Sequence, residues 1–390
     1  MQVTGRDNNM KIGFESMPGI AEALLENLSE KKLSEAVPDE LVQGLERVVV
    51  TGCGDSYAAT LGTKELNERM FAGCDYHALR TIDVSRHFVF PQRAPEKTLV
   101  MVISVSGGGA RVTEAMMRAA KAGCTTLGIT AHPESRMGVQ AQYILQLEIP
   151  QLPVSSIASQ TRNYLAALMT TLLMGLHAGR VRGVISERQV EERRAEILRY
   201  VRAVCDPGVL DRVDDQMLRL ASAGWKDYLG YDFVGAGSDF ATAYFGTAKF
   251  FEYYGALSCL NDSEDWCHIN YFMRDRGRIG SIVVASQNSA SFSRSVETIA
   301  SMQKSGRNVL VVTDAAPEAF IEGVTVCRLP GTDYAYISPL MNYIPLCMLG
   351  NYIALLNNYE YFGGMGPENP LFSQEGGINT IKSSKIVLID

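Results

Sequence analysis

The chain has 390 residues and a net charge of −7, from 36 basic and 43 acidic side chains, and no basic tract stands out, which argues against nucleic acid as its main partner. Its hydrophobic content of 46% supports full cores, and its length fits two or three domains. The polar start predicts no secretory leader, and the longest apolar stretches, near 165–176 and 344–356, are too short and interrupted to predict a membrane span.

An amphipathic pattern over residues 12–30 predicts a leading helix. After it, short β-branched runs alternate with helically spaced stretches, which predicts strands and helices in turn at 47–51, 56–70, 99–104, 110–122 and 125–130. Gly123 is a typical C-terminal glycine for the helix predicted at 110–122. The alternation predicts an α/β fold with a right-handed, doubly wound parallel sheet.

A charge-dense helix over 186–202, closed by Asp206-Pro207-Gly208, is expected to link this part to a second one. Further strands are predicted at 231–234, 282–285 and 309–313, and the tail from 359 is rich in Gly, Asn and Pro. We expect five parts, in chain order: an N-terminal helical segment (1–40), a first domain (41–180), a helical linker (181–225), a second domain (226–356) and a C-terminal tail (357–390).

The two halves share motifs at a constant spacing. Gly52-Cys53-Gly54 matches Gly235-Ala236-Gly237, and Lys121-Ala122-Gly123 matches Lys304-Ser305-Gly306, both with an offset of 183 residues. A constant offset indicates a duplicated domain. Between these markers the halves differ. The first half has Ser-Val-Ser-Gly-Gly-Gly at 104–109, whereas the corresponding segment of the second half is Ser-Gln-Asn-Ser at 286–289. Such divergence suggests that one half binds and the other reacts.

Eight cysteines are scattered along the chain, and none forms a Cys-x-x-Cys pair. This spacing disfavours structural zinc and thioredoxin-like chemistry. We expect mostly reduced core thiols, a cytoplasmic location, and no metal or other cofactor.

The loop at 104–111 follows a predicted buried strand and precedes a helix. Backbone N–H groups converge in such a turn, and the helix N-terminus adds positive potential. The hydroxyls of Ser104 and Ser106 can complete a cage for phosphate. A plain glycine-rich turn is the alternative, but Ser56 at the head of the neighbouring helix favours phosphate. The loop is no Walker motif, because no Gly-Lys-[Ser/Thr] follows.

A dinucleotide fingerprint is the other interpretation of the Gly-x-Gly pairs. The third glycine of that fingerprint is replaced by Tyr57 and Phe240, so we set NAD aside.

Lys249 and Glu252 are three residues apart on a predicted helix, so they share a face, and His268 follows sixteen residues after Glu252. A Glu/His pair suits proton transfer on a sugar. From spacing alone, a surface ion pair and a packed imidazole are the better interpretation.

The motifs at 52–57 and 104–109 resemble the paired motifs of SIS (sugar isomerase) domains. From about residue 12 the chain resembles the isomerase half of the glutamine–fructose-6-phosphate amidotransferase family, through Gly-Ala-Gly-Ser-Asp-Phe at 235–240, Lys-Phe-Phe-Glu at 249–252, Leu-Pro at 329–330 and Lys-Ile-Val-Leu-Ile-Asp at 385–390. The glutaminase half has no counterpart in this resemblance. Two tandem SIS domains, each a parallel sheet flanked by helices, are the fold it implies.

The resemblance also implies roles for single residues. The substrate phosphate would be held by Ser56, Ser104, Ser106 and the backbone of Gly107, Gly108 and Gly109, with Ser159 near the sugar. Glu252 matches the carboxylate that moves a proton between C1 and C2, supported by Lys249. His268 matches the histidine that opens the sugar ring from the partner subunit of a homodimer, and Lys385 matches the tail lysine that contacts the open-chain carbonyl.

This chain departs from the family pattern at three positions. The family usually has threonine at Asp55, glutamine at Val105 and threonine at Gly109. Asp55 puts a carboxylate near the sugar hydroxyls or an amine, and the other two changes remove polar contacts. A tail insertion between 358 and 378 has no obvious family equivalent and is expected to reshape the pocket.

The expected protein is a phosphosugar isomerase or isomerising deaminase that acts on a hexose- or hexosamine-6-phosphate-like substrate. Because no glutaminase half is expected to deliver ammonia, breakdown is favoured over synthesis. A deglycase of a 6-phosphorylated Amadori compound is the first alternative. A phosphosugar-binding regulator without turnover is the second, and the retained Glu252, His268 and Lys385 disfavour it.

Overall fold

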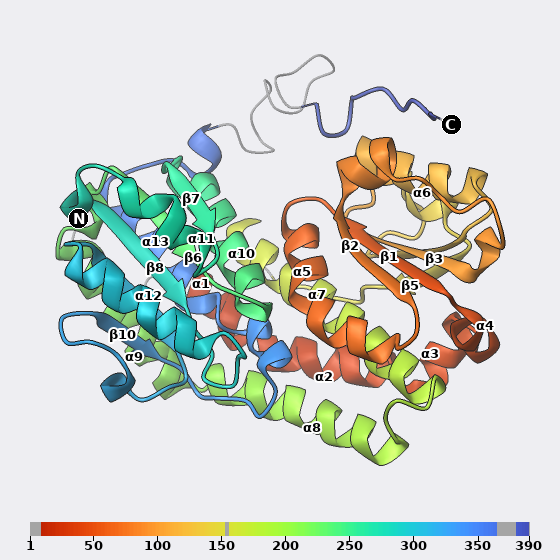
Figure 1. Cartoon of the computed structure of the whole chain (residues 1–390), viewed down its shortest axis with the longest axis horizontal. Helices are drawn as coiled ribbons and strands as arrows, with labels where there is room; N and C mark the ends of the chain where they lie inside the picture. The colour runs from red at the N-terminus through yellow and green to blue at the C-terminus, as the bar shows by residue number, and fades with distance from the viewer. Residues whose placement is uncertain (1–8, 153–155, 365–379, 390) are drawn as a thin grey trace. The chain divides into compact units, whose positions relative to one another are not determined.

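The computed structural model describes residues 9–152, 156–364 and 380–389, and the chain divides into two compact units (Figure 1). The β1–β5 unit is formed from Gly19–Pro153, Gln160–Leu198 and Pro370–Asp390. The β6–β10 unit is formed from Met1–Pro18, Val154–Ser159 and Arg199–Asn369. Both units are discontinuous in sequence. The five consecutive boundaries expected from the sequence stay a prediction.

Each unit contains one five-stranded parallel sheet, and the strand order is the same in both, namely β2-β1-β3-β4-β5 and β7-β6-β8-β9-β10. The first sheet has the strands β1 (Arg47–Gly52), β2 (Asp75–Arg80), β3 (Thr98–Ile103), β4 (Thr125–Thr130) and β5 (Tyr143–Gln146). The second has β6 (Gly230–Val234), β7 (Ser258–Asn261), β8 (Ile279–Val284), β9 (Asn308–Thr313) and β10 (Thr325–Arg328). The predicted duplication and the α/β fold with two parallel sheets are confirmed.

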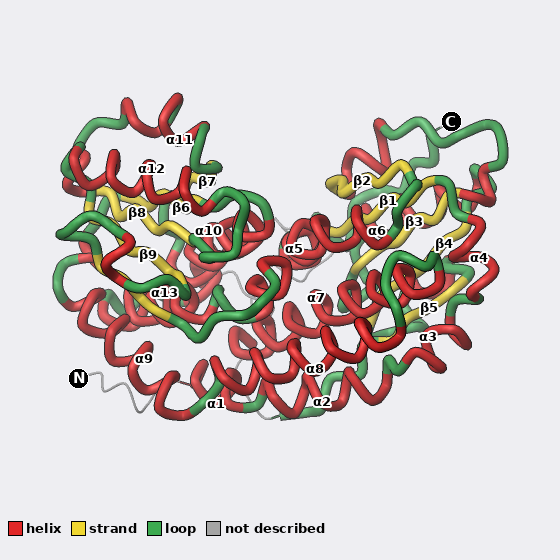
Figure 2. The backbone as a smooth tube through the Cα atoms, turned by 60° about the horizontal axis from the view of Figure 1, so that its bottom comes forward, coloured by secondary structure: helices red, strands yellow, loops and turns green. Residues whose placement is uncertain are grey.

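Helices cover both faces of each sheet, as Figure 2 shows for the strands drawn in yellow. The β1–β5 unit contains all or most of the helices α2 (Met17–Asn27), α3 (Glu30–Ala36), α4 (Asp39–Gly44), α5 (Asp55–Met70), α6 (Ala110–Lys121), α7 (Ser156–Val181) and α8 (Glu187–Val204). The other helices are α1 (Asn9–Glu15), α9 (Pro207–Ser222), α10 (Ser238–Tyr254), α11 (Asp265–His268), α12 (Phe292–Lys304) and α13 (Ile344–Leu356). Short helical turns cover Asp83–His87, Pro95–Lys97, Gly138–Gln140, Trp225–Asp227, Asn270–Phe272, Arg276–Arg278, Pro317–Ala319, Ala335–Leu340 and Tyr361–Gly364.

The alternation of side chains along the buried strands decides which helix packs on which face. In the first sheet, Val49, Val100 and Val102 form a core cluster with Val112 and Met116 of α6. The helix α5 contacts β1, β2 and β3 but contributes nothing to this cluster, so it covers the other face. In the second sheet, α12 packs on one face through Ile299 and Met302, and α10 with α13 packs on the other.

The N-terminal stretch is helical, but it is not the single helix predicted over 12–30. It consists of α1, α2 and α3, with breaks at Ser16 and Leu28-Ser29. The turn at 206–208 also differs from its prediction. Asp206 does not simply close α8, because its carboxylate accepts hydrogen bonds from Gly208 N and Val209 N, and it therefore caps the start of α9 with Pro207 in the first turn.

The stretch Ala335–Leu356 is long and apolar enough to cross a membrane by length and composition, which the sequence pattern over 344–356 did not predict. However, 89% of its most apolar window is buried within the structure. Its apolar character is therefore explained by the core that it fills against α9 and α10.

Candidate functional site

The strand order of the first sheet creates a switch point between β1 and β3. The chain leaves β1 toward β2 on one side and leaves β3 toward β4 on the other, so the loops after these two strands separate at the carboxyl edge. Ligands of open α/β sheets bind at such a crevice. Ser56 follows β1, and the segment 104–109 follows β3. The structure therefore brings the predicted phosphate residues to the switch point of one sheet.

The Gly-x-Gly pair after β1 lets α5 begin directly against the strand. A Cβ on Gly52 would lie 2.7 Å from the backbone carbon of Ser56, and Gly54 has a φ of +54°. Neither feature tolerates a side chain without a shift of the backbone. Gly235 and Gly237 meet the same two requirements in the second sheet, with a φ of +60° at Gly237. The Gly-x-Gly motif that the two halves share thus has a packing cause.

The loop after β3 turns back on itself at Gly107, which has a φ of +59°. A Cβ there would lie 1.8 Å from Ser135 Oγ, so only glycine fits. The N–H of Gly107 donates to Ser104 O at 3.1 Å, and its carbonyl accepts from Met137 N. The N–H of Gly108 points to Ser106 Oγ at 3.5 Å. Ser106 is exposed and Ser104 half-buried, so solvent can reach both residues of this turn.

Asp55 is the first residue of α5 and is half-buried. A carboxylate at a helix N-terminus is stabilised by the helix dipole. Its negative charge beside Ser56 suits a hydroxyl or an ammonium group of a ligand better than a phosphate.

In the second sheet, Asp239 stands where Ser56 stands in the first, at the same offset of 183 residues. Its side chain is buried, and its two oxygens accept hydrogen bonds from Ser286 N at 2.9 Å and Ser286 Oγ at 2.5 Å. Ser338 Oγ lies 3.4 Å from the same carboxylate. The buried carboxylate of Asp239 is thus an internal anion, and it accepts the hydrogen bonds that Ser286, in the loop after β8, could otherwise donate to a ligand. The second switch point is therefore filled by a side chain of its own unit, whereas the corresponding position of the first sheet holds the neutral Ser56.

Burial raises the pKa of Asp239 to about 6, although the hydrogen bonds from Ser286 oppose the shift. The folded protein therefore binds this proton more tightly than the unfolded chain, whose aspartates titrate near 4. The protonated carboxyl therefore stabilises the fold at low pH, and the free energy of unfolding falls by about 3 kcal/mol as the pH rises from about 4 through about 6.

We therefore expect Asp239→Asn to flatten the fall of melting temperature between about pH 4.5 and 7. Asn cannot ionise, so the variant loses the part of the pH dependence that this carboxyl causes. Differential scanning calorimetry across this range measures it, with Asp215→Asn on the exposed side of α9 as the control. Parallel profiles for wild type and Asp239→Asn would show that Asp239 ionises in its ordinary range.

Glu252 and Lys249 lie on α10 and form the ion pair that their spacing allows. Lys249 Nζ lies 2.7 Å from Glu252 Oε2, and it also lies 4.7 Å from the ring centre of Phe245. The lysine side chain is fully buried, whereas 30% of the glutamate side chain is exposed. A buried cation thus fixes the orientation of a carboxylate that solvent can reach. This arrangement is more specific than a surface ion pair.

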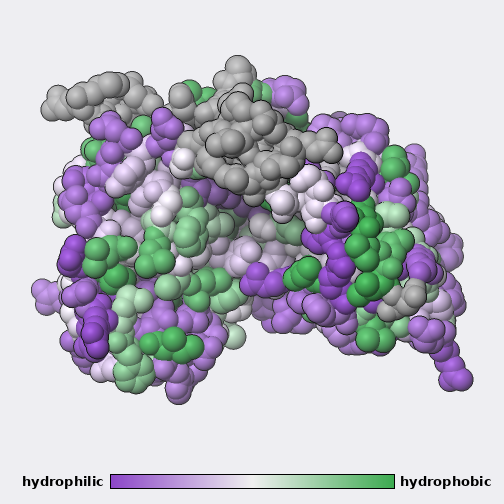
Figure 3. Space-filling view, turned by 90° about the horizontal axis from the view of Figure 1, so that it is seen from above, coloured by the Kyte–Doolittle hydropathy of each residue, from purple (hydrophilic) through white to green (hydrophobic). Residues whose placement is uncertain are grey.

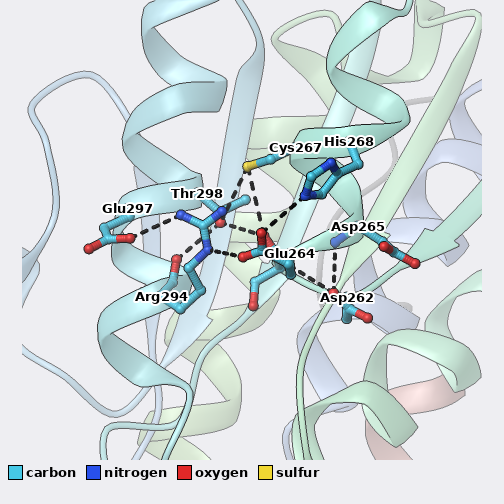
Figure 4. Close-up of polar contacts among 9 residues, drawn as sticks. Asp262, Glu264, Asp265, Cys267, His268, Arg294, Glu297 and Thr298 are labelled. Carbon is cyan, nitrogen blue, oxygen red and sulfur yellow. Dashed lines mark hydrogen bonds and ion pairs between the residues drawn. The ribbon is translucent and has the colours of Figure 1, made fainter.

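His268 ends α11, and its side chain is 68% exposed. Its Nε2 lies 3.2 Å from Glu264 Oε1, and Arg294 of α12 binds the other oxygen of Glu264 at 2.6 Å (Figure 4). The hydrogen bonds from Arg294 and His268 lower the pKa of Glu264, so this carboxylate stays charged at neutral pH. The imidazole of His268 and the carboxylate of Glu252 therefore have different partners.

The remaining predicted residues fall into different units. Ser159 is half-buried in α7 and belongs to the β6–β10 unit, with Glu252. Lys385 is exposed and belongs to the β1–β5 unit, where its carbonyl accepts a hydrogen bond from Arg111 in the first turn of α6. Most of the insertion at 358–378 lies outside the described residues. Among the residues that are described, no group of three His, Cys, Asp or Glu side chains is arranged to hold a metal ion.

Two features escaped the sequence analysis, namely the internal anion Asp239 and the contacts of the tail with α6. The exchange of Ser56 for Asp239 inside the repeated motif was a visible signal for the first. Nothing in the spacing indicated the second, because the partners are more than 270 residues apart.

No family model matches the chain. Its sequence is 22% identical to the glutamine–fructose-6-phosphate aminotransferase of Thermococcus kodakarensis over 92% of this chain and 55% of that protein. The corresponding enzyme of Halobacterium salinarum is 30% identical over 50% of this chain and 30% of its own length. The chain thus spans about half the length, or less, of the curated relatives that it matches.

Solved structures share the whole fold. The C-terminal domain of glucosamine–fructose-6-phosphate aminotransferase from Francisella tularensis superposes with a TM-score of 0.78 at 16% identity, covering 91% of this chain and 98% of that one. The sequence likeness and the paired sheets agree with the motifs at both switch points. The chain therefore has the fold of two tandem SIS-like (sugar isomerase) domains, and its sequence resembles the isomerase half of glutamine–fructose-6-phosphate aminotransferase.

Proposed function

We propose that the protein is an enzyme that converts a hexose- or hexosamine-6-phosphate-like substrate by proton transfer between C1 and C2. The Ser/Gly loop after β3, with Ser56, binds the phosphate, and Glu252 moves the proton. The same steps release ammonia when C2 carries an amine, so an isomerase and an isomerising deaminase share this chemistry. A solved structure of this fold, from Thermotoga maritima, bears the name glucosamine-6-phosphate deaminase (TM-score 0.65, 17% identity, 93% of this chain and 98% of that one).

The observation that carries the proposal is the Lys249–Glu252 pair. Aldose–ketose interconversion needs a carboxylate that takes the C2 proton and returns it to C1 through a cis-enediol or enolamine. Such a base must be oriented and must remain reachable. Glu252 meets both conditions, because a fully buried lysine holds it at 2.7 Å while part of its side chain stays exposed. Lys385 is assigned to the open-chain carbonyl of the substrate, which a cation polarises.

The test is turnover of defined sugar phosphates in deuterated water. Fructose 6-phosphate, glucose 6-phosphate, glucosamine 6-phosphate and a 6-phosphorylated Amadori compound are each incubated with the protein and followed by proton NMR. Loss of substrate with deuterium at C1 of a ketose product, or at C2 of an aldose product, supports the proposal, and released ammonia or amino acid identifies the leaving group. Binding without turnover or exchange for every compound would instead identify a regulator.

We also propose that the protein acts as a homodimer in which His268 serves the active site of the partner subunit. His268 is followed by exposed apolar side chains, of which Ile269 is 59% and Phe272 is 72% exposed. Apolar patches among hydrophilic surface are also visible on the face shown in Figure 3. Exposed apolar surface beside a candidate catalytic group is what a subunit interface would cover.

Mixing two inactive variants should then restore activity. In a one-to-one mixture of Glu252→Gln and His268→Ala, half of the dimers are mixed and each has one intact site, so about a quarter of the wild-type rate is expected. The rate is measured after subunit exchange has been confirmed by native mass spectrometry. A mixture as inactive as its components would show that each site is built from one chain.

A further inference from the structure

The described part of the C-terminal tail, 380–389, lies on α6 and on the loop that precedes it. The carbonyl of Ile381 accepts a hydrogen bond from Ala110 N at 2.8 Å, so the tail caps the first N–H of the helix. The carbonyl of Lys382 lies 3.4 Å from an Arg136 guanidinium nitrogen. The tail is therefore in contact with the helix end that follows the Ser/Gly loop.

A buried carboxylate holds the tail in place. Glu114 of α6 is fully buried, and it accepts hydrogen bonds from Arg111 at 2.6 Å and from Val387 N at 2.7 Å. Arg86 binds the same carboxylate at 2.6 Å. Arg111 in turn donates to Ser384 Oγ at 3.2 Å. A buried carboxylate with two arginine partners and a backbone donor is a fixed structural element, because moving it would leave buried charges and a buried acceptor without these partners.

The loop itself offers few free donors. The N–H of Gly107 is used inside the turn and that of Ala110 by the tail. Val105 and Gly109 have no polar side chain. A phosphate dianion held by neutral hydroxyls and one or two N–H groups would lack a cationic partner, although charge-assisted hydrogen bonds are the strong ones.

Glycine at 108 and 109 leaves room for the tail, and the tail brings a cation to this place. A Cβ on Gly108 would lie 3.7 Å from Lys382 Cε, and one on Gly109 would lie 3.9 Å from Ile381 Cγ2. A methyl group would fit at Gly108, whereas at Gly109 it would also lie 3.2 Å from Val112 Cγ2, and a longer side chain at either position would approach the tail. The same hypothetical Cβ on Gly108 lies about 4.0 Å from Ser106 Oγ, so Lys382 and Ser106 face one small region.

We propose that Lys382 is a ligand-binding residue that supplies the positive charge for the phosphate group of the substrate, with Glu114 as the positioning residue that holds the tail. The proposal rests on the proposed function, since it concerns the same phosphate. Lys382 compensates for the absent side chains at Val105 and Gly109. It also gives the tail a binding role that is separate from the one assigned to Lys385.

The test compares Lys382→Gln with Lys64→Gln, which removes the same charge from the exposed side of α5. Binding of fructose 6-phosphate and of inorganic phosphate is measured by isothermal titration calorimetry at low and moderate salt. We expect Lys382→Gln to weaken both ligands about tenfold, and more at low salt, as for the loss of a charged hydrogen-bond donor. Lys64→Gln should bind as wild type.

Glu114→Gln provides a second measurement. It should increase hydrogen exchange of the amides in 380–389 and reproduce the weaker phosphate binding, while Lys382→Gln leaves the exchange unchanged. If Lys382→Gln binds both ligands as wild type while Ser104→Ala with Ser106→Ala does not, the role of Lys382 is overturned and the phosphate site stands. If the wild type binds neither ligand, the phosphate site and this proposal both fail.

Discussion

Glu252→Gln should reduce turnover by roughly two to four orders of magnitude, the usual range for removal of a general base. Glutamine keeps the shape and most hydrogen bonds of glutamate, including an acceptor for Lys249 at the 2.7 Å contact, but it cannot take up a proton. The substrate phosphate is assigned to residues of the other compact unit, so its affinity should change little. Single-turnover kinetics and calorimetric binding separate the two quantities.

Isotope exchange sharpens this experiment. With an aldose phosphate as substrate, the wild type should introduce solvent deuterium at C1 of the ketose product, whereas Glu252→Gln should lose this exchange together with turnover. Glu68→Gln, on the exposed surface of α5, is a matched control for the same chemical change and should behave as wild type. An enzyme that remains fully active with Glu252→Gln would refute the assignment of the base, and with it the proposed mechanism.

Ser104→Ala combined with Ser106→Ala should weaken binding of a sugar phosphate by up to about a hundredfold. Each hydroxyl donates a charge-assisted hydrogen bond to the phosphate, and at about 1.5 kcal/mol for each contact, the lower end of the usual range, the pair contributes about 3 kcal/mol. The turn should survive the change, because it is closed by backbone contacts of Gly107 with Ser104 and Met137 rather than by the hydroxyls. The affinity is measured by calorimetry for a phosphorylated sugar and for the same sugar without phosphate.

The unphosphorylated sugar serves as the internal control, since it should bind equally weakly to both proteins. Ser289→Ala, in the corresponding loop of the second sheet, is the control variant and should leave the affinity unchanged, because Asp239 already occupies the donors of that switch point. Unchanged affinity of the double variant for the sugar phosphate would mean that the phosphate is bound elsewhere.

The sequence by itself determined the α/β fold and its duplication. The strands β1, β3, β4, β6, β8 and β9 were predicted to within a few residues, because central strands of parallel sheets are continuous apolar runs. The edge strands β2, β5, β7 and β10 were missed, since one side of each is partly exposed and its apolar run is short or mixed. The ion pair of Lys249 with Glu252 was also predictable, because a helix brings residues three apart to one face.

Only the tertiary structure decided how deeply Lys249 is buried, that Asp239 fills the second switch point from within, and that the tail lies on α6 beside Gly108. Burial and long-range contacts depend on how elements distant in the chain pack together. Glu114 and Val387 are 273 residues apart, and no local periodicity records their hydrogen bond. Sequence patterns reflect neighbours along one helix or strand. The charged side chains that hold this tail, Glu114 with Arg86 and Arg111, meet the tail only when the helices pack on the sheet in the folded protein.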